Sequence, residues 1–229
     1  MLIIHTSDFH GKLTYKKAKK IYKYKEKGAI LLDSGDAICA GNFDLRFYEK
    51  TLFLMSQIGY TAGAVGNREF HPIPFFFKFK LKNSSFPHLS ANLFYTKKLS
   101  KILPYLDLKI EDFNITLIGL TVPVVKEIWK KISPLYFLNP IFCGEKLAEK
   151  FYEKSNLIIF LTHMGIEEDI KLAKKLKKFS LILGGHSHIL MKEPLKVDNV
   201  YIFHSGCYAE NISIIELKGR EIKVFVEKL

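Results

Sequence analysis

Residues able to bind a metal ion or move a proton occur in five short polar clusters along the chain. Each cluster follows a short apolar run, and the clusters occupy residues 7–11, 34–36, 66–69, 162–165 and 184–188. Seven of their side chains carry an oxygen or an imidazole nitrogen that could bind a cation: Asp8, His10, Asp36, Asn67, His163, His186 and His188. This mixture of oxygen and nitrogen donors, without a thiolate, suits manganese, iron, cobalt, nickel or zinc better than calcium.

Spacing within the first two clusters supports a shared site. Asp8 and His10 are separated by one residue, so on an extended segment both side chains project to the same face and can hold one ion together. Asp36 follows Gly35, which allows a sharp backbone turn, and a carboxylate has two oxygens that can bridge two ions. We therefore expect these groups to serve a site that can hold two cations.

Taken singly, these residues have ordinary structural explanations. A lone histidine is most often a satisfied core or surface residue, and an aspartate after a strand often caps a helix. Five metal-competent clusters at successive strand ends are hard to attribute to coincidence. We therefore interpret the seven side chains as one metal site.

The apolar runs before the clusters have the length of β-strands. They cover residues 2–6, 29–33, 61–65, 156–161 and 180–183. Amphipathic spacing predicts helices at about 14–27, 44–58, 144–154 and 166–178. Strands that alternate with helices indicate an α/β layered sheet, in which ligands bind beyond the carboxyl ends of the strands. Residues 200–229 differ, because three strands separated by turns predict an antiparallel section that closes a second sheet.

Composition favours a single globular domain over residues 1–229. A chain of 229 residues with 48% hydrophobic residues can form one sizeable core but is short for two full domains. No apolar run reaches the ~18 residues needed to cross a bilayer, and the first residues lack a basic start and a cleavage site, so we expect a cytoplasmic protein. Cys39, Cys143 and Cys207 form no paired spacing, so we expect reduced, mostly structural thiols.

The formal net charge of +12 comes largely from lysines placed among apolar residues at helical spacing. Solvated helix faces explain this pattern best, and attraction of an anionic ligand or contact with a membrane surface are the weaker alternatives. The sequence has no motif for reading bases, so nucleic acid is not an expected partner.

The polar clusters resemble the motifs of one known family, the calcineurin-like metallophosphoesterases, and within it the catalytic domain of the 5′-nucleotidase group. The residues that carry this resemblance are 5–11, 35–36, 66–67 with 69–70, 161–165 and 184–188. Stretches between them, such as 86–92 and 118–121, are also similar, so the resemblance spans nearly the whole chain. It implies a four-layer α/β fold of two mixed β-sheets packed face to face and flanked by helices.

The resemblance also implies a dinuclear site and its chemistry. Carried over position by position, it assigns one metal ion to Asp8, His10, Asp36 and His188, and the second to Asp36, Asn67, His163 and His186. Asp36 would bridge the two ions, for which we favour manganese. The implied reaction is in-line attack on phosphorus by a metal-bound hydroxide, with a nucleotide or another small phosphate compound as substrate.

The chain departs from the 5′-nucleotidase pattern where that group has a catalytic pair. The group has a histidine after the asparagine and an aspartate three residues further on, and this chain has Arg68 and His71 there. A guanidinium keeps its proton at ordinary pH but can bind phosphoryl oxygens through two parallel hydrogen bonds, so we expect Arg68 to stabilise negative charge. His71 could instead supply the proton to the leaving group. We also expect no C-terminal base-binding domain of the kind that secreted 5′-nucleotidases carry.

Two alternative functions remain open at this point. An asparagine followed by arginine and an acidic residue also resembles the motif of UDP-2,3-diacylglucosamine pyrophosphatases. The apolar and basic stretch 74–82 could then be a lid for an acyl chain or a membrane contact, and is otherwise a core-packing helix with its lysines outward. Because Arg68 and His71 replace the usual pair, a metal-binding module with weak catalysis is the second alternative.

A few side chains outside these motifs could also contribute to the site. Glu210, Asn211 and His204 could reach the site from residues 200–229, although polar turns need no function. Cys39 is better explained as a buried packing thiol than as a ligand. Trp129 could anchor the core or stack on a substrate.

Overall fold

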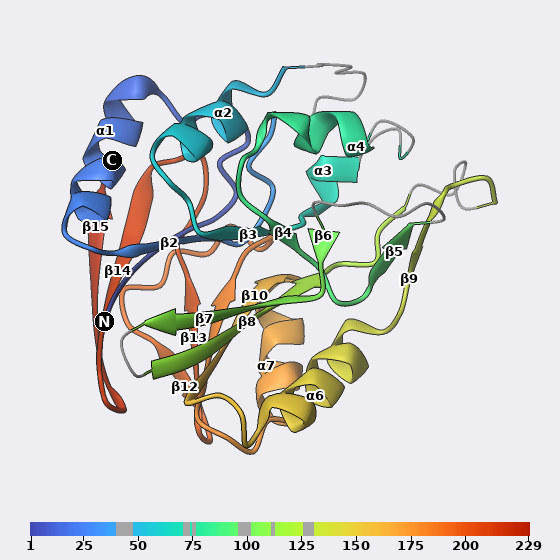
Figure 1. Cartoon of the computed structure of the whole chain (residues 1–229), viewed down its shortest axis with the longest axis vertical. Coiled ribbons are helices and arrows are strands. Elements are labelled where there is room, and N and C mark those ends of the chain that lie inside the picture. Colours follow the sequence, from blue (N-terminus) through green and yellow to red (C-terminus); the bar gives the residue numbers. More distant parts are fainter. Residues whose placement is uncertain (40–47, 71–73, 75–76, 96–101, 111–112, 126–130) are drawn as a thin grey trace.

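A computed structural model describes residues 1–39, 48–70, 74, 77–95, 102–110, 113–125 and 131–229. Figure 1 shows two β-sheets stacked face to face, with α1 and α2 above them and α6 and α7 below. This arrangement confirms the predicted four-layer α/β sandwich. None of the described helices is long and apolar enough to cross a membrane.

The described part of the chain builds a seven-stranded mixed sheet from its N-terminal half and its last residues. The strand order is β15-β14-β1-β2-β3-β4-β6. The strands from β1 to β6 run parallel to one another: β1 (Leu2–Thr6), β2 (Ile30–Asp33), β3 (Ala62–Ala64), β4 (His88–Leu89) and β6 (Ile102–Leu103). The hairpin of β14 (Asn211–Lys218) and β15 (Glu221–Lys228) adds to β1 in the antiparallel direction.

A six-stranded mixed sheet packs against it, in the order β12-β13-β11-β10-β8-β7. Its four central strands are parallel: β13 (Val200–His204), β11 (Ser180–Gly184), β10 (Leu157–His163) and β8 (Phe113–Thr121). The antiparallel edges are β12 (Leu195–Val197) and β7 (Tyr105–Ile110). A separate two-stranded sheet pairs β5 (Leu93–Tyr95) with β9 (Leu135–Phe137).

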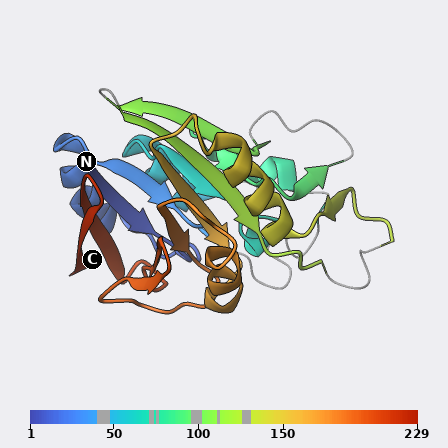
Figure 2. The ribbon, with the colours of Figure 1, turned by 90° about the horizontal axis from the view of Figure 1, so that it is seen from below.

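Helices cover the outer faces of the two sheets. The longer helices are α1 (Tyr15–Glu26), α2 (Lys50–Gln57), α6 (Pro140–Phe151) and α7 (Ile166–Ala173). Short turns of helix follow β3: α3 (Asn67–Phe70), α4 (Phe77–Lys80) and the 3₁₀ helix η2 (Leu81–Asn83). Figure 2 views the same ribbon from below, where α6 and α7, gold to orange, lie across the six-stranded sheet.

Three groups of buried apolar side chains fill the spaces between the four layers. One joins α1 and α2 to the seven-stranded sheet, one lies between the sheets, and one joins α6 and α7 to the six-stranded sheet. The two sheets lie in direct contact where Gly119 of β8 meets Leu89 of β4, because a Cβ on Gly119 would lie 2.2 Å from the Leu89 carbonyl. A residue without a side chain is therefore required at this contact.

Helix periodicity predicted the helices but not all of their ends. The helix expected at 14–27 is α1, which begins after Thr14, whose hydroxyl accepts a hydrogen bond from the Lys17 amide. Helix α6 begins earlier than the expected residue 144, because Asn139 caps it and Pro140 fits its first position. Helix α7 stops at Ala173 rather than 178. Of the helix expected at 44–58, residues 44–47 lie outside the described residues and α2 begins at Lys50.

The prediction that residues 200–229 form one antiparallel section was wrong for β13. That strand runs parallel to β11 in the six-stranded sheet, whereas the β14–β15 hairpin extends the seven-stranded sheet beside β1. Turn residues reveal a hairpin, but they do not reveal which sheet edge the hairpin joins.

Candidate functional site

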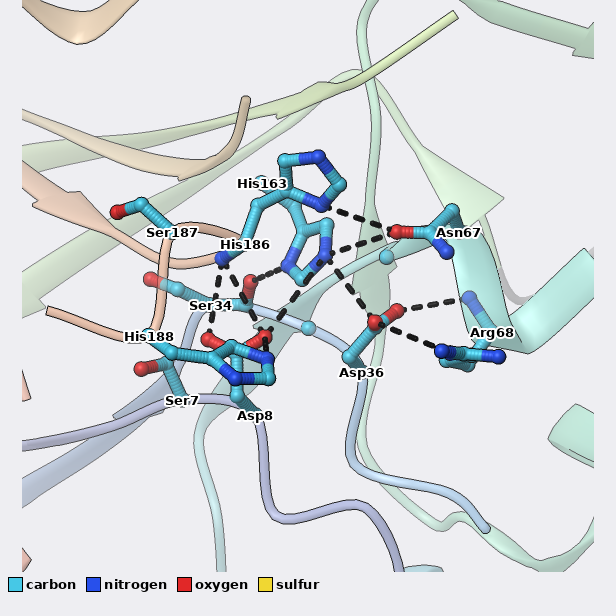
Figure 3. Close-up of polar contacts among 12 residues, drawn as sticks. Ser7, Asp8, Ser34, Asp36, Asn67, Arg68, His163, His186, Ser187 and His188 are labelled. Carbon is cyan, nitrogen blue, oxygen red and sulfur yellow. Dashed lines mark hydrogen bonds and ion pairs between the residues drawn. The ribbon is translucent and has the colours of Figure 1, made fainter. Parts of the chain in front are cut away.

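The five polar clusters meet at one edge of the two stacked sheets (Figure 3). Three clusters follow the carboxyl ends of β1, β2 and β3 in one sheet, and two follow β10 and β11 in the other. All seven side chains predicted to bind metal lie in this region, within one network of contacts. The sheet edge thus collects residues that are far apart in the sequence, as expected for a parallel α/β sheet.

The backbone around these residues is strongly turned. Left-handed φ angles occur at five of the seven positions: Asp8 (52°), His10 (45°), Asp36 (54°), His186 (75°) and His188 (56°). Such angles are uncommon outside glycine and concentrate at functional sites. The prediction of an extended segment from Asp8 to His10 was therefore wrong. The two side chains converge because the chain turns after β1 ends at Thr6.

The first group of converging side chains is Asp8, His10 and His188. The Nε2 atoms of His10 and His188 lie 2.9 Å apart. The Oδ1 atom of Asp8 lies 3.7 Å from the His10 Nε2 and 3.4 Å from the His188 Nε2. Two backbone contacts hold Asp8 in place, since its carboxylate accepts from the His186 amide at 3.0 Å and its own amide donates to the Gly35 carbonyl at 2.9 Å.

The second group is Asp36, Asn67, His163 and His186. The Asn67 Oδ1 lies 3.3 Å from the His163 Nε2 and 3.1 Å from the His186 Nδ1. The same His163 nitrogen is 3.4 Å from the Asp36 Oδ2 and 4.0 Å from the Asp8 Oδ1. His163 therefore lies between the two aspartates, and the two groups form one continuous cluster.

The donor set of this cluster fits divalent cations. Ring nitrogens, carboxylate oxygens and an amide oxygen all point inward, and the imidazole nitrogens approach one another as ligands of a shared ion do. The Nδ1 of His163 donates a hydrogen bond to the Ser34 carbonyl at 2.7 Å. The other ring nitrogen, Nε2, therefore faces the cluster.

Glu69 supports the cluster from below, and sequence reasoning missed this role. Its buried carboxylate accepts hydrogen bonds from the backbone amide of Gly66 at 2.7 Å and from those of Asp36 and Ala37 at 3.1 Å each. It thereby joins the turn after β2 to the turn after β3. Gly66 is needed for this arrangement, because a Cβ there would lie 2.2 Å from the Asp36 Oδ1. The signal available in the sequence was an acidic residue two positions after the expected ligand Asn67.

The protein itself strongly shifts the pKa values of the buried groups. Burial opposes charge on His163, but Asp36 and Asp8 outweigh it and raise the His163 pKa to about 10. Burial likewise opposes charge on Asp36, and the neighbouring His163 nevertheless lowers the Asp36 pKa to about 2. Burial raises the Glu69 pKa to about 7. Burial lowers the pKa values of His10 and His186.

Arg68 lies at the border between the cluster and solvent. Its amide donates to the Asp36 Oδ1 at 2.7 Å, and its Nε lies 3.9 Å from the Asp36 Oδ2. The side chain is 42% exposed. The guanidinium is thus anchored beside Asp36 while part of it faces outward. His71 lies outside the described residues.

The other residues noted in the sequence have mixed outcomes. His204 is buried, with its Nε2 2.8 Å from Asp169 and its Nδ1 3.2 Å from the Ser187 hydroxyl, so it contacts the loop of the site rather than the cluster. Glu210 is exposed. Tyr208 was missed, although its ring lies 5.3 Å from the His10 ring and 5.4 Å from the His188 ring.

The three cysteines are free thiols, as expected. Cys39 is only partly buried, which differs from the buried thiol predicted. In the stretch 74–82, Lys80 is buried and donates to the Arg68 carbonyl at 3.1 Å, while Phe79 is 41% exposed. Lysines therefore do not all face outward there, because a backbone carbonyl pairs with the Lys80 ammonium. Trp129 lies outside the described residues.

Comparison with known proteins identifies the family. Residues 1–190 match the family model described as calcineurin-like phosphoesterase, and the chain belongs to this family. A 5′-nucleotidase of Vibrio parahaemolyticus is 34% identical over 222 residues, which cover 82% of this chain and 39% of that relative. A trifunctional nucleotide phosphoesterase of Bacillus subtilis is 28% identical over 244 residues, which cover 87% of this chain and 16% of the relative. The chain thus spans two fifths or less of the length of these relatives.

Solved structures share the fold. The 5′-nucleotidase precursor of Thermus thermophilus superposes with a TM-score of 0.81 at 21% identity, covering 100% of this chain and 54% of that one. The calcineurin-like phosphoesterase YfkN of Bacillus subtilis superposes with a TM-score of 0.77 at 19% identity, covering 100% and 90%. These likenesses support the predicted fold class.

Proposed function

We propose that this chain hydrolyses a phosphate ester or anhydride of a nucleotide or a similar small compound, using two divalent cations. The observation that carries the proposal is the convergence of all seven predicted ligands, with the Asp8 Oδ1 within 4.0 Å of ring nitrogens from His10, His163 and His188. The names of its relatives, 5′-nucleotidase and nucleotide phosphoesterase, support a nucleotide substrate.

The two groups of side chains suggest how the cations would be shared. Asp8, His10 and His188 would hold one ion, and Asn67, His163 and His186 the other, with Asp36 between them. Divalent ions in such a site supply a nucleophile at neutral pH and neutralise charge on the phosphoryl oxygens. The mixed oxygen and nitrogen donors suit manganese, iron, cobalt, nickel or zinc, and manganese is the ion we favour for the assays.

Arg68 would bind the phosphoryl group of the substrate. Its backbone amide bond to Asp36 fixes the residue beside the cluster, and its partly exposed guanidinium can present two parallel N–H groups to an incoming phosphate. Because this group does not release a proton, the chemistry favours a leaving group that needs none, such as the phosphate of an anhydride or an activated phosphodiester.

A substrate screen with a matched pair of variants tests the proposal. The manganese-loaded protein is assayed with nucleoside monophosphates, cyclic nucleotides, phosphodiesters, nucleotide sugars and a diacylated UDP-sugar. We expect Asp36→Asn to lose at least ~100-fold in kcat/KM, since charge beside the cations is removed. Asp198→Asn is the control, because Asp198 is exposed and has the same left-handed backbone, φ 50° against 54° for Asp36.

The same assay separates the alternatives. Turnover of the diacylated UDP-sugar alone would favour the lipid pyrophosphatase function. Absence of turnover with every substrate, or equal activity of the two aspartate variants, would contradict the proposal. Arg68→Lys retains the charge but loses the planar fork, so a fall in kcat would support its role as a phosphate-binding group.

A further inference from the structure

A pocket lies at the opposite end of the six-stranded sheet from the metal cluster. It has a volume of about 400 Å³ and lies beside Phe179 and Asn199, which directly precede β11 and β13. Those strands run from this pocket to Gly184 and His204 at the site. At ~3.3 Å per residue, a five-residue strand separates the two regions by roughly 15 Å. The pocket is therefore distinct from the cluster that would carry catalysis.

Positive charge dominates the lining of this pocket. It contains Lys177, Lys178, Lys196 and Arg220 but a single carboxylate, Glu153, which leaves a formal charge of +3 from four cations and one anion. Within the described residues, no carboxylate lies at ion-pair distance from Lys177, Lys196 or Arg220. Glu153 and the nearby Glu149 offset only part of this positive charge, so an anion bound among the cations would be stabilised.

The cationic groups are held by aromatic rings and backbone carbonyls. The Arg220 guanidinium lies 6.0 Å from the centre of the Phe179 ring, and the Lys196 ammonium lies 5.5 Å from the centre of the Tyr201 ring. Lys178 differs from the others, because its ammonium donates to the carbonyls of Tyr152 and Ser155 at the end of α6. The pocket thus combines one anchored lysine with two cations that lie over aromatic rings, and Lys177 completes the lining.

We propose that this pocket binds a soluble compound through a diphosphate or triphosphate group. Two or three adjacent phosphates carry the charge that complements +3, and a planar guanidinium with two lysine ammoniums matches closely spaced phosphoryl oxygens. A concave pocket of this volume lies in the range of small-molecule sites, which favours a small ligand over an extended acidic surface. The inference does not depend on the proposed hydrolysis.

Lysine acylation followed by mass spectrometry tests the site directly. The purified protein is treated with a lysine acylating reagent with and without inorganic pyrophosphate or tripolyphosphate, at constant ionic strength. We expect acylation of Lys177 and Lys196 to slow at least about threefold, since their ammoniums would be engaged by phosphate. Lys16 and Lys19, exposed on α1, are the internal references and should change little.

A pair of variants keeps the test specific. Arg220→Gln should raise the concentration of pyrophosphate or tripolyphosphate needed for half of the full protection by about tenfold or more, because a charge-assisted pair of hydrogen bonds is lost. Lys16→Gln removes the same charge elsewhere and should leave the protection unchanged. Equal slowing at all four lysines, or none at Lys177 and Lys196, would overturn the proposal. Since the readout is local, loss of hydrolytic activity would leave this result unaffected.

Discussion

Among single residues, the buried pair of His163 and Asp36 has the clearest physical consequence. Their side chains lie 3.4 Å apart with almost no exposure to solvent. Burial alone would favour the uncharged form of both side chains, yet each charge stabilises the other. The pKa of His163 is therefore raised to about 10, and the pKa of Asp36 is lowered to about 2. The metal-free protein therefore keeps a proton on His163 at neutral pH, where the proposed ligand set requires a free nitrogen.

The first prediction is that metal binding releases this proton. A cation and a proton compete for the His163 nitrogen, so apparent metal affinity should rise by up to about tenfold per pH unit from neutral pH towards the His163 pKa of about 10. Calorimetric titration with manganese in buffers of different ionisation enthalpy counts the protons released. His163→Asn is the control and should release about one proton fewer.

The same pKa shift determines how the stability of the metal-free protein changes with pH. A histidine whose pKa rises on folding adds stability that is fully present below its ordinary pKa of 6.5 and is lost as pH rises through about 10. Metal-free protein should therefore become less stable at alkaline pH. If manganese binding released no proton and its affinity did not depend on pH, the conclusion that His163 is protonated in the metal-free protein would be wrong.

Residue type predicted the donors better than it predicted their geometry. Asp8 and His10 were predicted as ligands from their chemistry and spacing, and they do lie close together, but their left-handed backbone could not be foreseen, because such angles are imposed by the surrounding structure. Glu69 was missed as a support, since its role depends on three amides from two separate turns.

Among the elements, helix α7 and strand β13 support the loop that follows β11. Gly184 ends β11 and packs against His204 of β13 and Asp169 of α7, whose side chains are joined at 2.8 Å. His204 also contacts Ser187, which separates the two histidines of this loop. Helix α7 and strand β13 therefore support the position of His186 and His188.

The second prediction concerns this packing. A Cβ at Gly184 would lie 2.2 Å from the His204 Nε2 and 2.3 Å from the Asp169 Oδ2, so Gly184→Ala must displace the buried pair. We expect a loss of about 1–3 kcal/mol in the free energy of unfolding. We also expect weaker manganese binding, because displacing the His204–Asp169 pair should shift the loop after β11, which carries His186 and His188. Chemical denaturation and calorimetry measure the two effects.

Gly63→Ala is the matched control in another buried strand. Its new Cβ would lie 3.3 Å or more from any neighbour, so only a small adjustment of the Phe86 ring is needed. Similar losses in both variants would show that the His204–Asp169 pair has no special part in supporting the loop.

Local sequence patterns predicted individual elements but not their partners. Helix α1 was predicted from its amphipathic spacing, which depends only on neighbouring residues. The start of α6 was misjudged because Asn139 and Pro140 define it more strongly than the apolar stripe does. The sheet joined by β13 depends on pairing with β11, a contact that local patterns do not contain.

At the scale of the whole molecule, the site joins the two sheets. Asp8, Asp36 and Asn67 follow strands of the seven-stranded sheet. On the other side, His163 ends β10 of the six-stranded sheet, and His186 and His188 follow β11. Hydrogen bonds already cross between the sheets here, as from the Ser34 hydroxyl to the Leu183 carbonyl at 2.5 Å. Cations held by both sets of ligands would add further links between the layers.

The last prediction follows from this arrangement: metal removal should lower the thermal stability of the whole chain rather than loosen one loop. A ligand that binds only the folded state adds about 2.7 kcal/mol when its free concentration is 100 times its dissociation constant. For a domain of this size, that corresponds to a rise in Tm of roughly 5–10 °C. Scanning calorimetry with manganese and after chelation measures the shift. Asp36→Asn should abolish most of it, whereas Asp198→Asn should preserve it, since Asp198 lies in an exposed turn. If manganese left the Tm of the unaltered chain unchanged, the two sheets would not share the cations, and the proposed assignment of ligands from both layers would fail.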